Sequence, residues 1–539
     1  MNLLRRKLLS AGAAFATMTA AEAVVAQNNP AGATEPPRKP QQKMSATTSR
    51  NNGPIPFECD ASFLKIQGEL PRELNGTLYR NGPNPQFDAP GAHWFVGDGM
   101  LHAFHLENGR ASYRNRWVRT PKWQAEHDAG RALFGGFGRK LQDAPATSTQ
   151  DGHVANTNIV FHAGRLLALE EGQLPTEIEP GTLATRGYCD YGGGIAGPFT
   201  AHPKIDPVSG EMIGFAYEAR GDVTDDLAVQ FFDAGGRLTR EVWLKAPLVS
   251  MMHDFAITRQ HVILPTTAMV TSLARLKAGL NHWAYDRTVP AWVGILPRDG
   301  DAKDVRWFKG PHDRAMLIHV TNARTEGNKV ILDAPVARGN FNPQFPNLDG
   351  TPFDDEARRN TIRRWTFDLS KPGDDAWQEE LLFPGVLPTS FTRMDDRYLT
   401  RPFRYSFNLL TDPTLPFDEA RGGNLRGKIT NAWYRFDHHT QRVERFSAGE
   451  THGLFEPQFV PRRRDAAEGD GYLMGVANDY AQMKSELVIA DAQRLAEGPI
   501  ARVKLPFRLH MQVHGCWVPA HELPFDFDID PDFIGGPYV

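Results

Sequence analysis

The chain has 539 residues, with 60 Lys or Arg against 64 Asp or Glu, so its formal net charge is -4 and its isoelectric point is about 6.5. Such a chain has no excess of positive charge with which to neutralise phosphates, which argues against nucleic acid as a partner. The length would allow several domains, although large all-β folds form single domains well beyond about 200 residues.

The N-terminus, residues 1–26, has the pattern of an export signal peptide. Arg5, Arg6 and Lys7 form a positive region, an Ala-rich apolar stretch follows, and the small residues before residue 27 suit a signal peptidase. The paired arginines before "KLL" resemble a twin-arginine signal, which is typical of proteins exported folded and metal-loaded. We therefore expect a periplasmic or otherwise exported protein, with an ordinary secretory signal as the alternative.

Residues 27–52 are polar and rich in proline, so they cannot bury enough apolar surface to order themselves. We expect a disordered linker here and one folded domain over residues 53–539. The three cysteines, Cys59, Cys189 and Cys516, are far apart and show no CxxC spacing, which argues against a disulfide framework. A single bridge would still leave one thiol free.

The remaining chain shows many short alternating segments between turn residues, which is typical of antiparallel sheet. The clearest predicted strands are residues 164–172, 328–337, 362–370, 431–440, 471–480 and 485–493. Helices are predicted only over 121–138 and 270–283. No repeat signature of fixed period recurs, so the local pattern fits a sandwich, a barrel or a propeller.

Four histidines each stand at the edge of a strand-like segment. They are His202 in "FTAHPKIDP", His253 in "SMMHDFAITRQHVILP", His319 in "MLIHVTNARTEGNKVILD" and His514 in "LHMQVHGCWVP". None has the i, i+4 spacing of a helical metal site. Residues so dispersed converge only if several sheets point their inner strands at one axis, which is the geometry of a propeller.

Together with "LYRNGPNPQF", "GDGMLHAFHLENGRASYRNRWVRT" and "FEPQFVPR", these segments resemble the carotenoid cleavage oxygenases from about residue 54 to the C-terminus. "PKWQAEHDAGRALFG" and "TEGNKVILD" are most similar to the bacterial lignostilbene dioxygenase branch. The resemblance implies an all-β, seven-bladed β-propeller with a helical and loop cap over the axis. It also implies one Fe(II) per chain, held by the four histidines. Imidazoles suit ferrous iron, and four neutral ligands leave positions for dioxygen.

The family orients its histidines with three glutamates that accept the second ring N–H. Glu171 and Glu456 match two of them. Glu170 competes with Glu171, but strand alternation points only one of the pair inward, and the motif favours Glu171. At the third position this chain has Ser390, in "SFTRMDDR". We expect its hydroxyl to accept from an imidazole without supplying charge.

The resemblance implies an oxidoreductase that uses O2 to split the C=C bond of a small hydrophobic alkene, a stilbenoid or related phenylpropanoid, into two carbonyl fragments. The alternatives are an apocarotenoid substrate with the same iron chemistry, and a non-catalytic binding scaffold. Lys122, in "RTPKWQAE", matches the branch's phenol-binding lysine and is assigned a catalytic role. The alternative is an exposed lysine at the start of a helix.

The segment "TSLARLKAGLNHWAY", residues 271–285, is interpreted as a helix packed against the rest of the protein. Weak membrane contact through the cap at this segment is the alternative.

Overall fold

The computed structural model describes residues 53–87, 94–135, 151–195, 197–310, 316–372 and 376–525. The predicted signal peptide (1–26) and linker (27–52) lie outside the described residues. The described part falls within a compact unit that spans Met44–Asp526.

The described residues of this unit form seven antiparallel sheets of four to six strands and one two-stranded sheet. The first contains β1 (Cys59–Ala61), β5 (Arg110–Trp117), β4 (Gly99–Glu107), β3 (Gly76–Pro83) and β34 (Gly515–Pro519). The second contains β6 (Asn158–His162), β7 (Arg165–Leu169), β8 (Thr176–Ile178) and β9 (Thr185–Tyr188). The third contains β10 (Lys204–Ile205), β11 (Met212–Ala216), β12 (Asp226–Phe232) and β13 (Leu238–Lys245).

The remaining sheets follow in chain order. The fourth contains β14 (Ala256–Ile257), β15 (His261–Pro265), β18 (Trp292–Pro297) and β19 (Arg306–Lys309). The fifth contains β20 (Met316–Leu317), β21 (Asn322–Glu326), β22 (Lys329–Ala337), β23 (Asn360–Asp368) and β24 (Trp377–Leu382). The sixth contains β25 (Thr392–Met394), β26 (Tyr405–Leu410), β27 (Ala432–Asp437) and β28 (Arg442–Phe446). The seventh contains β2 (Lys65–Gly68), β33 (Pro499–Lys504), β32 (Lys484–Asp491), β31 (Gly471–Asp479), β30 (Gln458–Pro461) and β29 (His452–Leu454).

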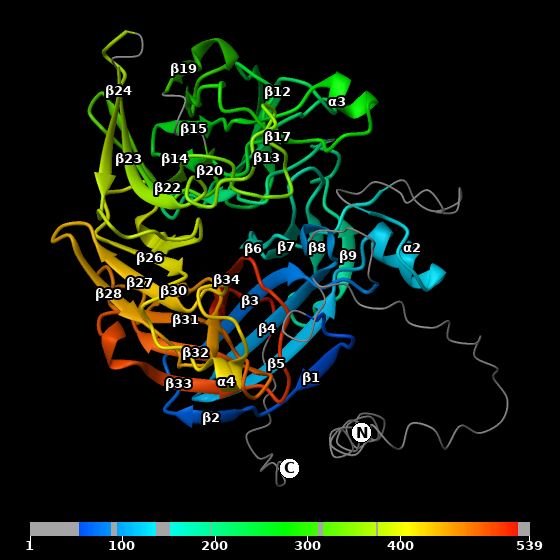
Figure 1. Cartoon of the computed structure of the whole chain (residues 1–539), viewed down its shortest axis with the longest axis vertical. Coiled ribbons are helices and arrows are strands. Elements are labelled where there is room, and N and C mark those ends of the chain that lie inside the picture. Colours follow the sequence, from blue (N-terminus) through cyan, green and yellow to red (C-terminus); the bar gives the residue numbers. More distant parts are fainter. Residues whose placement is uncertain are drawn as a thin grey trace. The chain divides into compact units, whose positions relative to one another are not determined.

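The sheets are the blades of a seven-bladed propeller, as expected. Figure 1 shows them following one another around the unit in chain order, from the blue strands of the first sheet to the orange strands of the seventh. Contacts between neighbouring inner strands, such as β14 with β21 and β30 with β34, surround the axis. All six strands named from the sequence are present, as β7, β22, β23, β27, β31 and β32.

Strands from both ends of the chain close the ring. The late strand β34 pairs with the early strand β3, with Trp517 opposite Leu78. The early strand β2 in turn completes the seventh sheet by pairing with β33, with Ile66 opposite Val503. Closure of this kind leaves no open end between the first and last sheets, which is how propellers protect their edges.

Apolar faces of neighbouring blades pack against each other to form the core. One cluster joins the first and seventh sheets and includes Leu78, Phe104, Val476 and Leu487, all buried. A second cluster joins the fourth and fifth sheets in the same way. Because these faces bury large apolar surfaces far from the axis, the residues at the inner strand ends are free to be polar.

The two predicted helices exist but are shorter than expected. Helix α2 (Pro121–Ala129) begins after Thr120, whose side chain accepts from the backbone N–H of Trp123, and ends at Gly130, whose φ of 63° is left-handed. Helix α3 (Leu273–Lys277) has no buried residue, whereas Thr271 and Trp283–Tyr285 are buried, so the segment 271–285 is packed at its ends and not along the helix. A third short helix, α4 (Glu419–Gly422), precedes β27.

The α3 segment is an insertion between the paired strands β16 (Met269–Val270) and β17 (Ala284–Tyr285). The backbone N–H of Met251 donates to the carbonyl of Met269 at 2.9 Å, which joins this insertion to the loop that carries His253. The three cysteines are free thiols, which agrees with the sequence argument against a disulfide framework. Within the described residues, no helix is long and apolar enough to cross a bilayer.

Candidate metal centre

The four histidines predicted from the sequence converge. Each lies in the loop just before an inner strand of a different blade: His202 before β10, His253 before β14, His319 before β21 and His514 before β34. Their side chains offer ligand atoms that all lie within 4.8 Å of one another. The prediction that the histidines occupy separate blades of a radial fold is therefore confirmed.

The spacing of the ring nitrogens suits a metal ion. Nε2 of His253 lies 3.0 Å from Nε2 of His202 and 3.2 Å from Nε2 of His319, which is in turn 3.2 Å from Nε2 of His514. Two metal–imidazole bonds of about 2.1 Å that meet at a right angle separate their nitrogens by about 3.0 Å. Four imidazoles therefore surround one point with the spacing that a first-row divalent ion requires.

Three of the four rings are oriented from behind by an oxygen atom. Nδ1 of His253 lies 2.9 Å from a carboxylate oxygen of Glu171, and Nδ1 of His514 lies 2.9 Å from one of Glu456. A carboxylate can only accept, so in these rings the proton is on Nδ1 and the lone pair on Nε2 points at the shared centre. The donor set therefore fits a metal, because rings held in this way present an unprotonated nitrogen to the shared centre.

Burial and mutual repulsion keep most of the cluster neutral. Burial lowers the pKa of His202 and His319 well below its usual value, and the neighbouring histidines lower it further. Burial also lowers the pKa of His514, against the opposing effect of Glu456. His253 differs, because Glu171 outweighs burial and raises its pKa. Neutral imidazoles are the form that binds metal ions.

The two adjacent glutamates have separate tasks, as the motif predicted. Glu171 points at His253, whereas Glu170 accepts from the backbone N–H of Val154 at 2.8 Å and contacts the ring of His153. Tyr217 adds a hydrogen bond to Glu171. The choice of Glu171 over Glu170 as the orienting residue agrees with these contacts.

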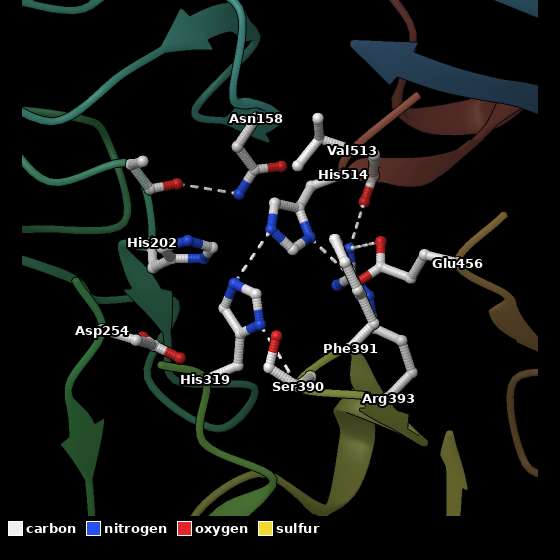
Figure 2. Close-up of polar contacts among 12 residues, drawn as sticks. Asn158, His202, Asp254, His319, Ser390, Phe391, Arg393, Glu456, Val513 and His514 are labelled. Carbon is white, nitrogen blue, oxygen red and sulfur yellow. Dashed lines mark hydrogen bonds and ion pairs between the residues drawn. The ribbon is translucent and has the colours of Figure 1, made fainter. Parts of the chain in front are cut away.

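Glu456 is held by two arginines that the sequence reading did not single out. One of its carboxylate oxygens contacts the guanidinium of Arg80 at 3.2 Å and that of Arg393 at 2.9 Å, and the other contacts His514. Burial alone would raise the pKa of Glu456, but Arg393, His514 and Arg80 hold it well below its usual value. Arg80 is completely buried, and burial lowers its pKa to about 10. The carboxylate therefore stays charged and fixed (Figure 2).

A lone arginine inside an otherwise uncharged, fully buried strand could have signalled this pairing. Arg80 lies in "LYRNGPNPQF", within β3, where every residue is buried. Arginine is almost never fully buried unless its charge is paired. The partner, however, is 376 positions away, so the sequence does not identify it.

Ser390 orients His319 through a different atom from the one expected. Nδ1 of His319 donates to the backbone carbonyl oxygen of Ser390 at 3.1 Å. The expectation of a side-chain hydroxyl acceptor is therefore corrected, because the main chain already supplies the oxygen. The acceptor carries no charge, as predicted, so the chain surrounds its histidines with two carboxylates and one carbonyl.

The ring of Phe391, next to Ser390, packs against two of the histidines. Its centroid lies 5.2 Å from the ring of His319 and 5.2 Å from that of His514 (Figure 2). An apolar ring in this place shields the two imidazoles from water. Sequence reasoning missed this residue, since a phenylalanine in a large β-protein is usually ordinary core.

Lys122 does not present a free positive charge. Its ammonium contacts Asp98 and Glu126, each at 2.7 Å, and its side chain is only 5% exposed. The exposed-lysine alternative is therefore wrong. The assignment as a phenol-binding catalytic cation gains no support from these contacts, because two carboxylates already neutralise the charge and none of its ion pairs involves the four histidines.

Lys122→Met should destabilise the protein by about 3–5 kcal/mol at pH 8, because two buried carboxylates lose their shared partner. Burial raises the pKa of Glu126. The charge of Asp98 raises it further, whereas that of Lys122 lowers it. A carboxyl whose pKa is raised by folding favours the folded state at low pH and opposes it as the pH rises. The loss of stability in Lys122→Met should therefore be smaller at pH 5 than at pH 8.

Chemical denaturation at the two pH values measures this difference. Lys245→Met is the control, since that lysine is exposed and its pairs with Asp225 and Asp226 lie at the surface. No measurable change is expected for the control. An unaltered unfolding curve for Lys122→Met at pH 8 would contradict a stabilising role for the buried cluster.

A second group of ligand atoms, from Glu218, Asp222 and His282, lies closer to the surface. The ring nitrogen Nε2 of His282 contacts the Glu218 carboxylate at 3.0 Å. Acidic groups often gather at a surface without a metal, and here a carboxylate already satisfies the imidazole. These residues serve below as a control for the four-histidine site.

Comparison with known proteins agrees with the geometry. A family model described as "Retinal pigment epithelial membrane protein" matches residues 52–519. The chain is 39% identical to the isoeugenol monooxygenase of Pseudomonas putida, over 86% of this chain and 96% of that protein. It is 38% identical to the lignostilbene-alpha,beta-dioxygenase isozyme III of Sphingomonas paucimobilis, over 87% of this chain and 96% of that protein.

A solved structure is similar along most of the chain. The lignostilbene dioxygenase of Pseudomonas brassicacearum superimposes with a TM-score of 0.83 at 36% sequence identity, covering 89% of this chain and 100% of that one. Residues 52–519, which the family model matches, contain all seven blades and the four histidines.

Proposed function

Because the chain belongs to the carotenoid cleavage oxygenase family, that of the retinal pigment epithelial membrane protein, we propose that it is a non-haem Fe(II) dioxygenase that cleaves an alkene C=C bond. The observation that carries this proposal is the convergence of four imidazole Nε2 atoms on one point. In the reaction the C=C bond breaks and each carbon gains one oxygen atom of O2, giving two carbonyl compounds. The balance needs no other reductant.

Bound Fe(II) would supply the redox chemistry with O2, and the chain supplies the rest. His202, His253, His319 and His514 would hold the metal. Glu171, Glu456 and the Ser390 carbonyl keep a proton on Nδ1 of three rings and so fix the ring orientations. The ring of Phe391 keeps water away from two ligands.

The substrate that we propose is a stilbenoid or a related phenylpropanoid alkene. The support is that two relatives, at 39% and 38% identity, are an isoeugenol monooxygenase and a lignostilbene dioxygenase. An apocarotenoid substrate would use the same iron chemistry, and it is an outcome of the test below. A non-catalytic scaffold has no need of glutamates that hold its histidines from behind.

Anaerobic reconstitution with Fe(II) and an oxygen-dependent assay test this proposal. Resveratrol, isoeugenol and an apocarotenal are offered separately, and carbonyl products are identified by mass. Aldehydes from a phenolic alkene, with one iron bound per chain, are expected. Products from the apocarotenal alone would move the substrate to the alternative class, and iron-loaded protein that cleaves none of the three would contradict the proposed substrate.

We also propose that residues 1–26 direct export by the twin-arginine route, as the paired Arg5 and Arg6 suggest. Cell fractionation of a variant with Arg5→Lys and Arg6→Lys tests this, since export should stop. Weak membrane contact through the α3 segment is proposed in the same way. It is supported by Leu273 and Leu280, which are 55% and 50% exposed.

A further inference from the structure

A repeated hydrogen-bond pattern joins neighbouring blades close to the axis. Asn81, Asn158 and Asn322 each accept, through Oδ1, the N–H of the residue that follows, at 2.8–2.9 Å. Each side chain also donates through Nδ2 to a backbone carbonyl of the next blade: Asn158 to Ala201 at 2.8 Å, and Asn322 to Arg401 at 3.0 Å. All three amides are buried and uncharged. The pattern therefore links blades without placing charge near the site.

In a fourth blade the same position is an aspartate. Asp254 accepts the N–H of Phe255 at 2.8 Å through Oδ1, like the three asparagines. Its other oxygen accepts the N–H of Val320 in the next blade at 2.8 Å, so the link between blades runs in the opposite direction. The carboxylate is buried, and its charge is matched by the ammonium of Lys204 in the preceding blade, at 2.7 Å.

These contacts connect the loops that carry three of the four ligands. Lys204 follows His202 by two positions, Asp254 follows His253 directly, and Val320 follows His319 directly. Figure 2 shows Asp254 beside the cluster, on the side of His202 and His319. One side chain therefore spans the three blades whose histidines lie next to one another.

A neutral amide could not make the same set of bonds. Three donors face Asp254: the Phe255 N–H, the Lys204 ammonium and the Val320 N–H. A carboxylate has acceptor sites on both oxygens, whereas an asparagine has one acceptor oxygen and an NH2 group that would face a donor. The charge at this position is therefore required by the local bonding, and Lys204 compensates for its burial.

We propose that the Lys204–Asp254 ion pair is a positioning device that sets the affinity of the four-histidine site for its metal. The inference rests on the proposed function only in that the site binds a divalent ion. A metal site needs its ligands held within about 0.5 Å of the working geometry, and loss of an outer partner typically weakens metal binding by about 10- to 100-fold. Within the described residues neither side chain forms a hydrogen bond or ion pair with a histidine ring, so we expect both to act through the ligand loops.

Co(II) affinity, measured by competition with a chelator, tests the proposal without any substrate. Asp254→Asn and Lys204→Met should each weaken Co(II) binding by about 10- to 100-fold and change the visible spectrum of the bound ion, which reports ligand geometry. Lys204→Arg should restore the affinity, because it keeps the charge. Lys204→Met also serves where Asp254→Asn fails to fold.

Asp491→Asn is the matched control. Asp491 is also buried, accepts the backbone N–H of Gln493 at 2.9 Å and pairs with Arg462 at 3.1 Å, but it lies at the far end of β32. It should lower the melting temperature and leave Co(II) affinity and spectrum unchanged. Wild-type affinity in both site variants, or an equal loss of affinity in Asp491→Asn, would overturn the proposal. Failure of the wild type to bind Co(II) would instead refute the metal site and the proposed function.

Discussion

His319→Ala should abolish bound iron and lower alkene cleavage by at least roughly 10³-fold, because members of a catalytic unit fail together when one is removed. His319 is central in the cluster, with its Nε2 3.2 Å from Nε2 of both His253 and His514. The substitution removes one of the four ligands and leaves a space between His253 and His514. Iron content by elemental analysis and turnover by product mass are the two measurements.

His282→Ala provides the control for that result. His282 belongs to the second group of ligand atoms, with Glu218 and Asp222, and none of its recorded contacts involves the four histidines. It should keep its iron and its activity. Iron retained by His319→Ala and lost from His282→Ala would place the metal at this second group and would contradict the four-histidine site.

Glu456→Ala should lower the free energy of unfolding of the metal-free protein by about 3–5 kcal/mol, the usual cost of removing one partner from a buried ion pair. The substitution leaves Arg80 fully buried without its carboxylate and takes from Arg393 its ion pair with Glu456. It also removes the acceptor for Nδ1 of His514, so iron affinity should fall by about 10- to 100-fold. Chemical denaturation and a metal competition assay measure the two effects separately.

Glu171→Ala distinguishes the effect of ligand orientation on metal affinity from the effect of a buried ion pair on stability. Glu171 accepts from His253 as Glu456 accepts from His514, but no arginine or lysine forms an ion pair with it among the described residues. It should weaken iron binding to a similar degree with a much smaller loss of stability. Equal losses of stability in the two variants would contradict the part given to the two arginines.

Much of the fold could be predicted, and the reason is local. Strands 329–337, 471–479 and 484–491 are buried along almost their whole length, so each is a short, mostly apolar run between turn residues that is visible in any short window. The number of blades was not visible in this way, because no repeat recurs along the chain. It followed from the resemblance to a family, as did the four histidines.

The residues Arg80, Lys204 and Asp254 could not be predicted, because the partner of each is distant in the sequence. Arg80 meets Glu456 across 376 positions, and the pairing of Lys204 with Asp254 depends on how two blades are placed side by side. Ser390 was identified as the departure from the family pattern, yet the acceptor is its backbone carbonyl. A sequence names the side chain at a position and gives no sign when the main chain takes over its task.

The central claim is that the iron-loaded chain splits one C=C bond and adds one atom of O2 to each carbon. Cleavage of a phenolic alkene by the Fe(II)-reconstituted protein under ¹⁸O2, stopped early to limit exchange with water, tests it directly. The account predicts label in both carbonyl products. Label in only one product, with the other oxygen coming from water, would contradict the dioxygenase reaction.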